Sequence, residues 1–269
     1  MTSYAAAIDL GIEGVEATIR AKRGKRFKNL PRLLGSHELS MYWVFRKANI
    51  SVDPGDCILV IADDPLMSTT FMRSLCGLLP ADEGTVRGDS RSLMVSPPKN
   101  RAINGLSVRQ AIFMLGGLYG MSDQEIDERT DEVIAMAQVK NMLSRRIEES
   151  PSHVKQQISF SLAMVAPVDI LAFNGSPVVG GPKFRPTCVE HLATQKANGK
   201  GLLISTPDHG LARALGTKAN LLDPEESTAA PLDEALEELK RRARSKKRQR
   251  RRLRRNQRPS FEEDDQPGF

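Results

Sequence analysis

The chain has 269 residues, of which 40% are apolar, so it can bury a real hydrophobic core and is not a disordered protein as a whole. The net charge of +6 is uneven: residues 240–258 hold 13 Lys and Arg and no acid, whereas residues 1–239 carry 26 basic and 29 acidic side chains, a charge of −3. Three widely spaced cysteines exclude a disulfide framework and predict reduced, structural thiols, and no apolar run approaches the roughly 18 residues of a membrane span.

The first forty residues show no clear element. Residues 19–35 are basic and are interrupted by Gly24, Pro31 and Gly35, so we expect an N-terminal arm over residues 1–40, formed as a loop or a flexible segment. Acidic residues stand where a signal peptide would have a basic start and an apolar block. The chain is therefore expected to be cytoplasmic.

Clear signals begin with a strand over residues 42–52, a turn containing Pro54 and Gly55, and a buried strand over residues 57–62. Apolar residues at helical spacing then predict a helix over residues 68–79. The residues just before it, Asp64 and Pro65, are typical of an N-cap followed by the first turn of a helix.

The middle of the chain is helical. We expect helices over residues 106–120 and 152–166, and between them a helix that begins at a capping box formed by Ser122 and Glu125. The apolar residues that this middle helix places on one face are Ile126, Val133, Ile134 and Ala137. Together these helices form an insertion over about residues 106–165.

Strand signals return after the insertion. The predicted strands are residues 169–173, 201–205 and 219–223, and a helix over residues 185–197 separates the first two. Apolar strands that alternate with helices indicate a mostly parallel sheet covered on both faces. The fold class is therefore α/β.

The C-terminal part, residues 224–269, is expected to be helical at first and then basic and disordered. The helix would place Leu232, Ala235, Leu236 and Leu239 on one side. The cations of residues 240–258 repel one another, so this segment should stay extended until it meets an anion. An anionic lipid surface and nucleic acid are both possible partners, although no aromatic residues interleave the cations to stack on bases.

Several stretches within residues 41–223 together resemble the nucleotide-binding subunit of an ABC transporter, of the type that exports capsular polysaccharide or O-antigen. The stretches are VFRKANISVDPGD, LCGLLPADEGTV, LSVRQAIFMLGGLYG, KQQISFSLAMVAPVDILAF, VVGGPKFRPTC and GLLIS. Each is weak alone, but their order and spacing match the family. The resemblance implies a P-loop NTPase-like domain over residues 41–223.

The residues at the family's phosphate-binding loop depart from its pattern. The loop reads ADDPLMSTT, which puts Ser68 at the position of the lysine and Thr69 at that of the hydroxyl that holds Mg²⁺. A phosphate cradle needs glycines, so that backbone N–H groups can close on the phosphates, and a lysine to meet their charge. We expect Asp63 and Asp64 to occupy the start of the helix instead and to repel a triphosphate.

The other positions that the resemblance assigns to catalysis are altered too. Asn174 and Gly175 stand at the metal-binding aspartate and the water-orienting glutamate, and Thr206 stands at the switch histidine. The remaining altered positions are Ser152, His153 and Val154 at the signature segment, Gly181 at the dimer-contacting aspartate, and Ile103 near the glutamine of the permease-coupling loop.

Trp43 stands where the family stacks an aromatic ring on adenine, although a strand residue packed on the core is the alternative. If any nucleotide is bound, the residues implied by the resemblance are Trp43, Ser68, Thr69 and Thr70. ATP and Mg²⁺ are implied by the resemblance only, and the four histidines share no metal-ligand spacing.

The sequence thus predicts a degenerate ATP-binding subunit of a polysaccharide export system that does not hydrolyse ATP. The resemblance implies a permease subunit as one partner, and a dimer either with a second copy of the chain or with a competent ATPase subunit. Residues 240–258 are expected to bind the inner face of the plasma membrane in preference to nucleic acid. The alternatives are a pseudo-ATPase scaffold that binds a membrane or nucleic acid through its tail, an active ATPase with an unusual site, and a protein unrelated to the family.

Overall fold

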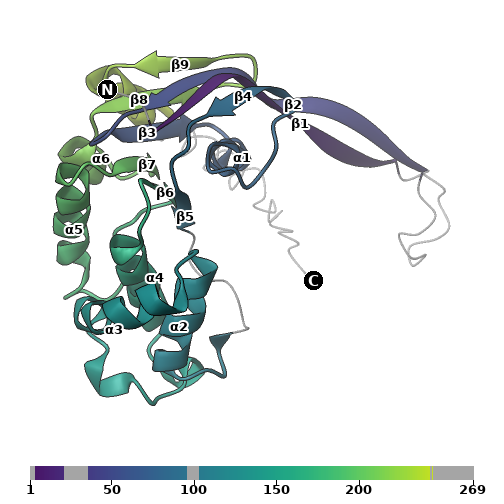
Figure 1. Cartoon of the computed structure of the whole chain (residues 1–269). Helices are drawn as coiled ribbons and strands as arrows, with labels where there is room; N and C mark the ends of the chain where they lie inside the picture. Colours follow the sequence, from purple (N-terminus) through teal and green to yellow (C-terminus); the bar gives the residue numbers. More distant parts are fainter. Residues whose placement is uncertain (1–3, 21–35, 96–102, 243, 245–269) are drawn as a thin grey trace, which may run out of the picture.

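The structure, a computed structural model, describes residues 4–20, 36–95, 103–242 and 244 (Figure 1). In chain order the elements are β1 (Ala5–Arg20), β2 (Ser36–Val52), β3 (Cys57–Ala62), α1 (Pro65–Leu75), β4 (Glu83–Arg87), β5 (Ser92–Val95), α2 (Val108–Leu118), α3 (Asp123–Ala137), η3 (Lys140–Met142), η4 (Ile147–Glu149), α4 (Val154–Val165), β6 (Ile170–Asn174), α5 (Arg185–Ala197), β7 (Gly201–Ser205), α6 (His209–Leu215), β8 (Lys218–Leu222) and β9 (Ser227–Ala230).

A six-stranded sheet in the order β5-β6-β7-β3-β8-β9 forms the centre of the molecule. Its neighbouring strands are parallel except for β8 and β9, which are antiparallel. The mostly parallel sheet predicted from the apolar strands is therefore confirmed, and the predicted strands 57–62, 169–173 and 201–205 correspond to β3, β6 and β7 within one residue.

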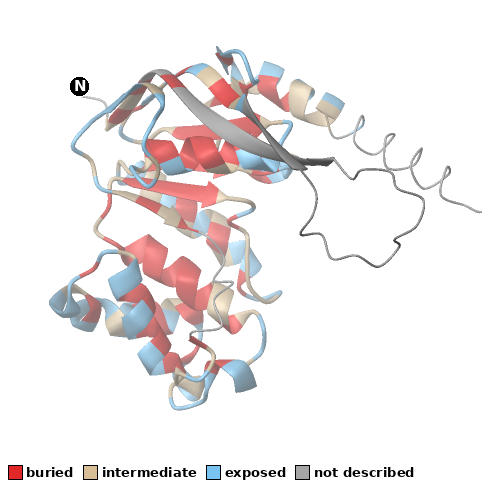
Figure 2. Ribbon diagram, turned by 90° about the vertical axis from the view of Figure 1, so that its right-hand side faces the viewer, coloured by how far each residue is buried: buried red, intermediate tan, exposed pale blue. Residues whose placement is uncertain are grey.

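Both faces of this sheet are buried, as the continuous apolar strands predict. Ile58 and Val60 of β3 pack on one face with Phe45 and Phe71, whose rings meet edge to face with centroids 5.6 Å apart. The alternate residues of β3 face the other cluster, which the helices α4, α5 and α6 cover. Figure 2 shows buried residues concentrated in the strands of the sheet and in helices packed against it.

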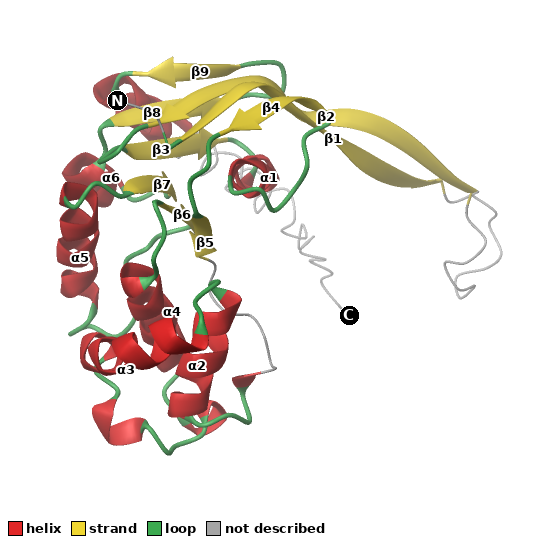
Figure 3. Cartoon of the chain, viewed as in Figure 1, coloured by secondary structure: helices red, strands yellow, loops and turns green. Residues whose placement is uncertain are grey.

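A second sheet, in the order β2-β1-β4, is antiparallel. Beyond β4, β1 and β2 continue together as a two-stranded ribbon that extends to the pair Arg20 and Ser36 (Figures 1 and 3). The loop or flexible arm expected over residues 1–40 is wrong for residues 5–20, which form β1, and for residues 36–40, which belong to β2. The loop expected over residues 21–35 lies outside the described residues.

The helical insertion forms a lobe at one side of the central sheet, made of α2, α3 and α4 (Figure 3). Its capping box is confirmed: Ser122 accepts from the Glu125 amide, and the Glu125 carboxylate accepts from the Ser122 amide at 2.8 Å. The four apolar residues predicted to share one face of α3 are all buried. A second capping box, between Ser107 and Gln110, begins α2.

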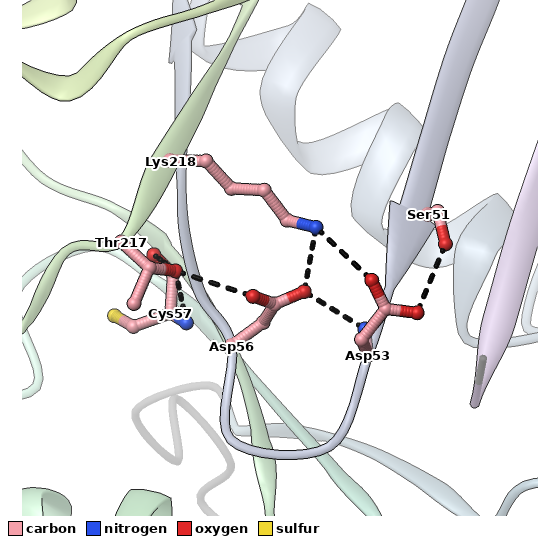
Figure 4. Close-up of polar contacts among 6 residues, drawn as sticks. All are labelled: Ser51, Asp53, Asp56, Cys57, Thr217 and Lys218. Atoms are coloured by element: carbon pink, nitrogen blue, oxygen red, sulfur yellow. Dashed lines mark hydrogen bonds and ion pairs between the residues drawn. The ribbon is translucent and has the colours of Figure 1, made fainter. Parts of the chain in front are cut away.

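The amino ends of β3 and β8 are held by a polar network around the predicted turn (Figure 4). Lys218 forms ion pairs with Asp56 at 2.6 Å and with Asp53 at 3.4 Å, and Thr217 exchanges hydrogen bonds with the backbone of Cys57. Gly55 has φ of +80°, which favours glycine in this turn. Burial alone would lower the pKa of Lys218, but hydrogen bonds and charge from Asp56 and Asp53 raise it. This network therefore supports the sheet at the end opposite the carboxyl ends of its strands.

The helix predicted at the start of the C-terminal part is present over residues 232–242. Ala235 and Leu236 are buried against the core, and Leu232 and Leu239 pack beside them, so the predicted apolar side is confirmed. The basic segment was expected to be extended, but its first residues, Lys240 to Arg242, continue this helix, and residues 245–258 lie outside the described part of the chain. Among the described residues, no helix has both the length and the apolar character of a membrane span.

Candidate functional site

A cleft of about 310 Å³ lies where β3, β6 and β7 end and α1 begins. Parallel α/β sheets bind ligands at this edge because the strand ends and helix starts converge there. Four residues selected by the family resemblance line the cleft, namely Ser68, Asn174, Gly175 and Thr206. Residues that the resemblance matched to separate family motifs thus lie together around one cleft.

The N-terminus of α1 is capped by the protein itself, as predicted for Asp64. Asp64 is extended, with φ −102° and ψ 127°, and its carboxylate accepts a hydrogen bond of 2.9 Å from the Leu66 amide. Pro65 has no amide hydrogen to offer. The amides of Met67 and Ser68 donate to the Asp64 carbonyl at 3.1 and 3.4 Å. The donors that would hold a phosphate at a helix N-terminus are thus absent or already bonded.

Asp63 directly precedes the N-cap residue Asp64, and its carboxylate has a cationic partner. Its carboxylate lies 3.4 Å from a guanidinium nitrogen of Arg242, in the C-terminal helix. The two adjacent aspartates therefore have different roles.

Two residues that the family would use to hold Mg²⁺ are bonded to each other. The Asn174 amide nitrogen donates a hydrogen bond of 2.9 Å to the Thr69 hydroxyl, which donates in turn to the Pro65 carbonyl at 2.7 Å. Ser68, at the lysine position, is buried and donates to the same carbonyl at 3.2 Å. This part of the cleft is consequently neutral.

Gly175 follows Asn174 at the position of the water-orienting glutamate. Its φ of +113° lies in a region that residues with a Cβ rarely adopt, and its amide donates to the Ser205 carbonyl at 2.9 Å. Thr206, at the switch histidine, is buried, and its hydroxyl accepts from the Asp208 amide at 3.2 Å. Neither position offers a group that could act as a general base.

The positions matched to the signature segment and the dimer contact lie next to each other. A Cβ on Gly181 would be 3.5 Å from the ring nitrogen of His153, which stands at the N-cap of α4 and makes no capping hydrogen bond there. Ile103, near the position of the coupling glutamine, is fully buried in the core. Nearby, the Gly180 amide donates a hydrogen bond of 3.4 Å to the side-chain oxygen of Gln156.

Trp43 does not line the cleft. The guanidinium of Arg46 lies 4.3 Å from the centroid of its ring, and Arg46 is held by a two-pronged ion pair with Glu83 of β4, at 2.8 and 3.1 Å. Thr70 is buried on α1 and is also absent from the cleft lining. The sequence analysis weighed adenine stacking against core packing for Trp43 and missed this third arrangement, in which Arg46 occupies a ring face.

The sequence analysis also missed a charged cluster at the rim of the cleft. Arg242 lines the cleft, and its guanidinium contacts Asp63, Asp223 and Glu238. A signal was present, because the predicted strand over residues 57–62 is followed directly by Asp63 and the predicted strand over residues 219–223 ends in Asp223. Hydrogen bonds from Arg241 and then Arg242 lower the pKa of Glu238 to about 2.

Metal ligation finds no further support in the described part of the chain, where no group of three or more His, Cys, Asp or Glu residues is arranged around a common point. Cys57, Cys76 and Cys188 are free thiols. Burial raises the pKa of Cys57 and of Cys76 to about 12, so both are protonated at neutral pH.

Comparison with known sequences gives relatives of low identity. No model of a protein family matches the chain. The teichoic acids export ATP-binding protein TagH of Levilactobacillus brevis is 23% identical over 172 residues, which cover 63% of this chain and 47% of TagH. The ABC transporter protein AbcA of Aeromonas salmonicida is 21% identical, with coverages of 69% and 60%. The Nod factor export ATP-binding protein I of Burkholderia lata is 23% identical, with coverages of 67% and 61%. The chain thus spans about half the length of the first of these curated relatives and about three fifths of the others.

Comparison with solved structures shows the fold. An ATP-binding subunit of an ABC transporter superposes with a TM-score of 0.64 at 17% identity, over 88% of this chain and all of that one. A nucleotide-free ATP-binding cassette gives 0.61 at 12% identity, over 86% and 92%. A dimeric cassette bound to ADP and phosphate gives 0.59 at 14%, over 85% and 98%. The chain has the fold of an ABC transporter ATP-binding subunit, and its resemblance to such subunits, export proteins among them, is confirmed.

Proposed function

We propose that the chain is an ATP-binding-subunit-like component of an ABC-type system that exports a cell-surface glycan, and that it does not hydrolyse ATP. The observation that carries the proposal is the start of α1. Pro65 has no amide hydrogen, and the amides of Leu66, Met67 and Ser68 are already bonded to Asp64. A phosphate would have to break these bonds and approach two carboxylates, Asp63 and Asp64.

The residues around the cleft do not fit MgATP. A magnesium site of this fold needs a hydroxyl and a carboxylate free to turn toward the ion. Here the hydroxyl of Thr69 is bonded to the amide of Asn174, which carries no negative charge. The lysine and the water-orienting carboxylate are replaced by Ser68 and Gly175. No step of phosphoryl transfer is therefore assigned to this chain.

The proposed setting follows from the relatives. Proteins named for teichoic acid and Nod factor export are similar to this chain over about two thirds of its length. We infer that the chain sits at the inner face of the plasma membrane against a permease subunit, paired with itself or with a competent ATPase subunit. Capsular polysaccharide and O-antigen are the glycans that the sequence resemblance implies.

ATP binding and turnover by the purified full-length chain test the proposal. Trp43 is the one tryptophan of the chain, so its fluorescence reports directly on any base that displaces Arg46 from its ring. We expect no Mg²⁺-dependent phosphate release and no quenching of Trp43 by ATP. Turnover that chelation of Mg²⁺ abolishes would contradict the proposal.

A second function is favoured by a different observation, the concentration of 13 basic residues in 240–258 beside a body of charge −3. On this proposal the chain is a pseudo-ATPase scaffold that holds a membrane or nucleic-acid partner through its tail. The neighbouring genes separate the two candidates. A permease gene and glycosyltransferase genes beside this one favour the export subunit, and their absence favours the scaffold.

A further inference from the structure

Arg242 is seated in the cleft at the place where the fold family binds phosphate. Its side chain is only 12% exposed. One terminal nitrogen lies 3.4 Å from Asp63, the other lies 3.5 Å from Asp223, and Nε donates to Glu238 at 2.8 Å. A single guanidinium group thus hydrogen-bonds Glu238 of its own helix and lies within ion-pair distance of two carboxylates of the body, one after β3 and one after β8.

The topology explains why two of these carboxylates are neighbours. β3 and β8 are adjacent parallel strands, and their last paired residues are Ala62 and Leu222. The next residue of each chain segment is an aspartate, so Asp63 and Asp223 emerge side by side at the carboxyl edge of the sheet. Two like charges this close repel each other unless a cation lies between them. A positive charge at this edge of the sheet would therefore stabilise the fold.

The helix of residues 232–242 delivers that charge. Ala235 and Leu236 are buried in the core, and Leu239 lines the same cleft as Arg242. Glu238 precedes Arg242 by four residues, so it stands beside it on the helix and orients the guanidinium. The apolar side of the helix packs on the core, and Arg242, in the last described turn, forms ion pairs with Asp63 and Asp223 at the edge of the sheet.

We propose that this cleft is a docking site for a guanidinium group, and that its occupant is Arg242 of the chain's own C-terminal helix. The site has the opposite polarity to the phosphate site of the fold family: it selects a cation, and the docked helix excludes anions. This inference is independent of the proposed export role, because it concerns only what the cleft binds.

The geometry favours arginine over lysine. A guanidinium is planar and presents five donors in a fixed fork, so different nitrogens can reach separate carboxylates at once. An ammonium group is a compact point charge on a flexible stem. Arg242→Lys should therefore retain the charge but lose part of the docking.

Hydrogen exchange of the full-length chain tests the docking. We expect Arg242→Ala to accelerate exchange of the amides at residues 235–239 by about tenfold, as local opening becomes easier. Arg241→Ala is the matched control, because Arg241 also pairs with Glu238 but is 80% exposed and has no ion pair with Asp63 or Asp223. Equal acceleration by the two variants would overturn the proposal. An unchanged melting temperature of the body confirms that the fold is intact.

Chemical rescue tests the selectivity without relying on that variant alone. Ethylguanidinium added to Arg242→Ala should restore protection, whereas ethylammonium at the same concentration and ionic strength should restore less. Equal rescue by both cations, or rescue by neither, would overturn the guanidinium site. If ATP, instead of ethylguanidinium, restored the slow hydrogen exchange of Arg242→Ala, the helix would merely cover a phosphate site. That result would also overturn the guanidinium site. Turnover of ATP by the wild-type chain would contradict both the proposed loss of hydrolysis and the exclusion of anions from this cleft. A failure of the hydrogen-exchange and rescue tests without any turnover would overturn only the guanidinium site.

Discussion

At the scale of single residues, the positions that the family resemblance assigns to catalysis are fitted to their surroundings. Ser68 is buried, Asn174 is bonded to Thr69, and Gly175 has a backbone conformation that a glutamate would strain. Each altered side chain is thus accommodated by its own neighbours. Restoring one family residue does not restore the arrangement that phosphoryl transfer requires.

This predicts that Ser68→Lys has no Mg²⁺-dependent ATPase activity, and that the double variant Ser68→Lys, Asn174→Asp is equally inactive. Both retain Gly175 and the Asp64 cap, so they lack a water-orienting carboxylate and free amide donors. A steady-state assay of phosphate release measures this, with the wild-type chain as baseline. Turnover by the single variant would show that the lysine alone was limiting.

The cap at Asp64 predicts a measurable loss of stability. Asp64→Ala should destabilise the protein by about 1 kcal/mol, since an N-cap hydrogen bond is lost, and lower its melting temperature by about 2–4 °C. Asp64→Ser is the control, because a serine can still cap the helix.

The double change Asp63→Gly, Asp64→Gly should also strengthen any residual nucleotide affinity. If stability rises and affinity stays the same, the two carboxylates are ordinary exposed loop residues.

The sequence could identify the residues of the cleft only where a local rule or the family pattern applied. Asp64 followed by Pro65 is a local signal, and it predicted the cap correctly. The cluster of Asp63, Asp223 and Arg242 joins three distant parts of the chain. The cluster forms only because β3 and β8 are neighbours in the sheet. An aspartate at the end of a strand does not indicate which other strand lies beside it.

At the scale of elements, strong apolar patterns were predicted well and weak ones were missed. Strand β3 and helix α3 follow their patterns closely. Strand β4 is mostly exposed and contains Gly84, so it has no apolar alternation to detect. Strand β1 is rich in Ala, Gly and Glu, which are depleted in strands, and its pairing with β2 overrides that local preference.

The C-terminal helix should be less stable in acid, because the ion pairs of Glu238 with Arg241 and Arg242 of the same helix require an ionised carboxylate. Hydrogen bonds from Arg241 and Arg242 lower the pKa of Glu238 from 4.5 to about 2 in the folded chain. A depressed pKa stabilises the folded state above the unfolded value, and that contribution is lost as the pH falls from about 4.5 toward 2. The ion pairs of Glu238 should therefore contribute most to stability near neutral pH, where they also orient Arg242.

Thermal unfolding of Glu238→Gln and the wild-type chain at pH 7, 5, 4 and 3 measures this contribution. The wild type should melt at a higher temperature at pH 7 and 5, and the difference should shrink at pH 4 and 3. Glu234→Gln is the control, since Glu234 lies on the same helix and forms no ion pair with a described residue. A difference that is independent of pH would mean that Glu238 acts by packing alone.

At the scale of the whole molecule, the order of strands and helices made the fold predictable despite identities of 17% or less to solved structures. Parallel strands are connected by crossovers, usually helices, so few arrangements of strands and helices along the chain are possible. Residues 41–223 contain predicted strands and helices in such an order. The domain limits themselves remain predictions. The charge distribution is also a property of the whole chain, and it bears on where the protein resides.

The tail is predicted to govern association with an anionic membrane. The body carries −3 and would be weakly repelled by such a surface, whereas residues 240–258 carry +13. Each basic residue that reaches the headgroups contributes about 1 kcal/mol. The attraction should weaken steeply with salt, because the Debye length falls from about 10 Å at 0.1 M to about 3 Å at 1 M.

Truncation after Arg244 tests this, because it removes nine basic residues and leaves Arg242 in the cleft. The full chain should sediment with vesicles of anionic lipid at low salt, and the truncated chain should stay in solution with its melting temperature unchanged. Vesicles of neutral lipid are the control, since they should bind neither chain. If the truncated chain sediments as well as the full one, the tail is not the anchor. If RNA releases the full chain from anionic vesicles at equal salt, nucleic acid is the preferred partner, and the scaffold function gains over the membrane-bound export subunit.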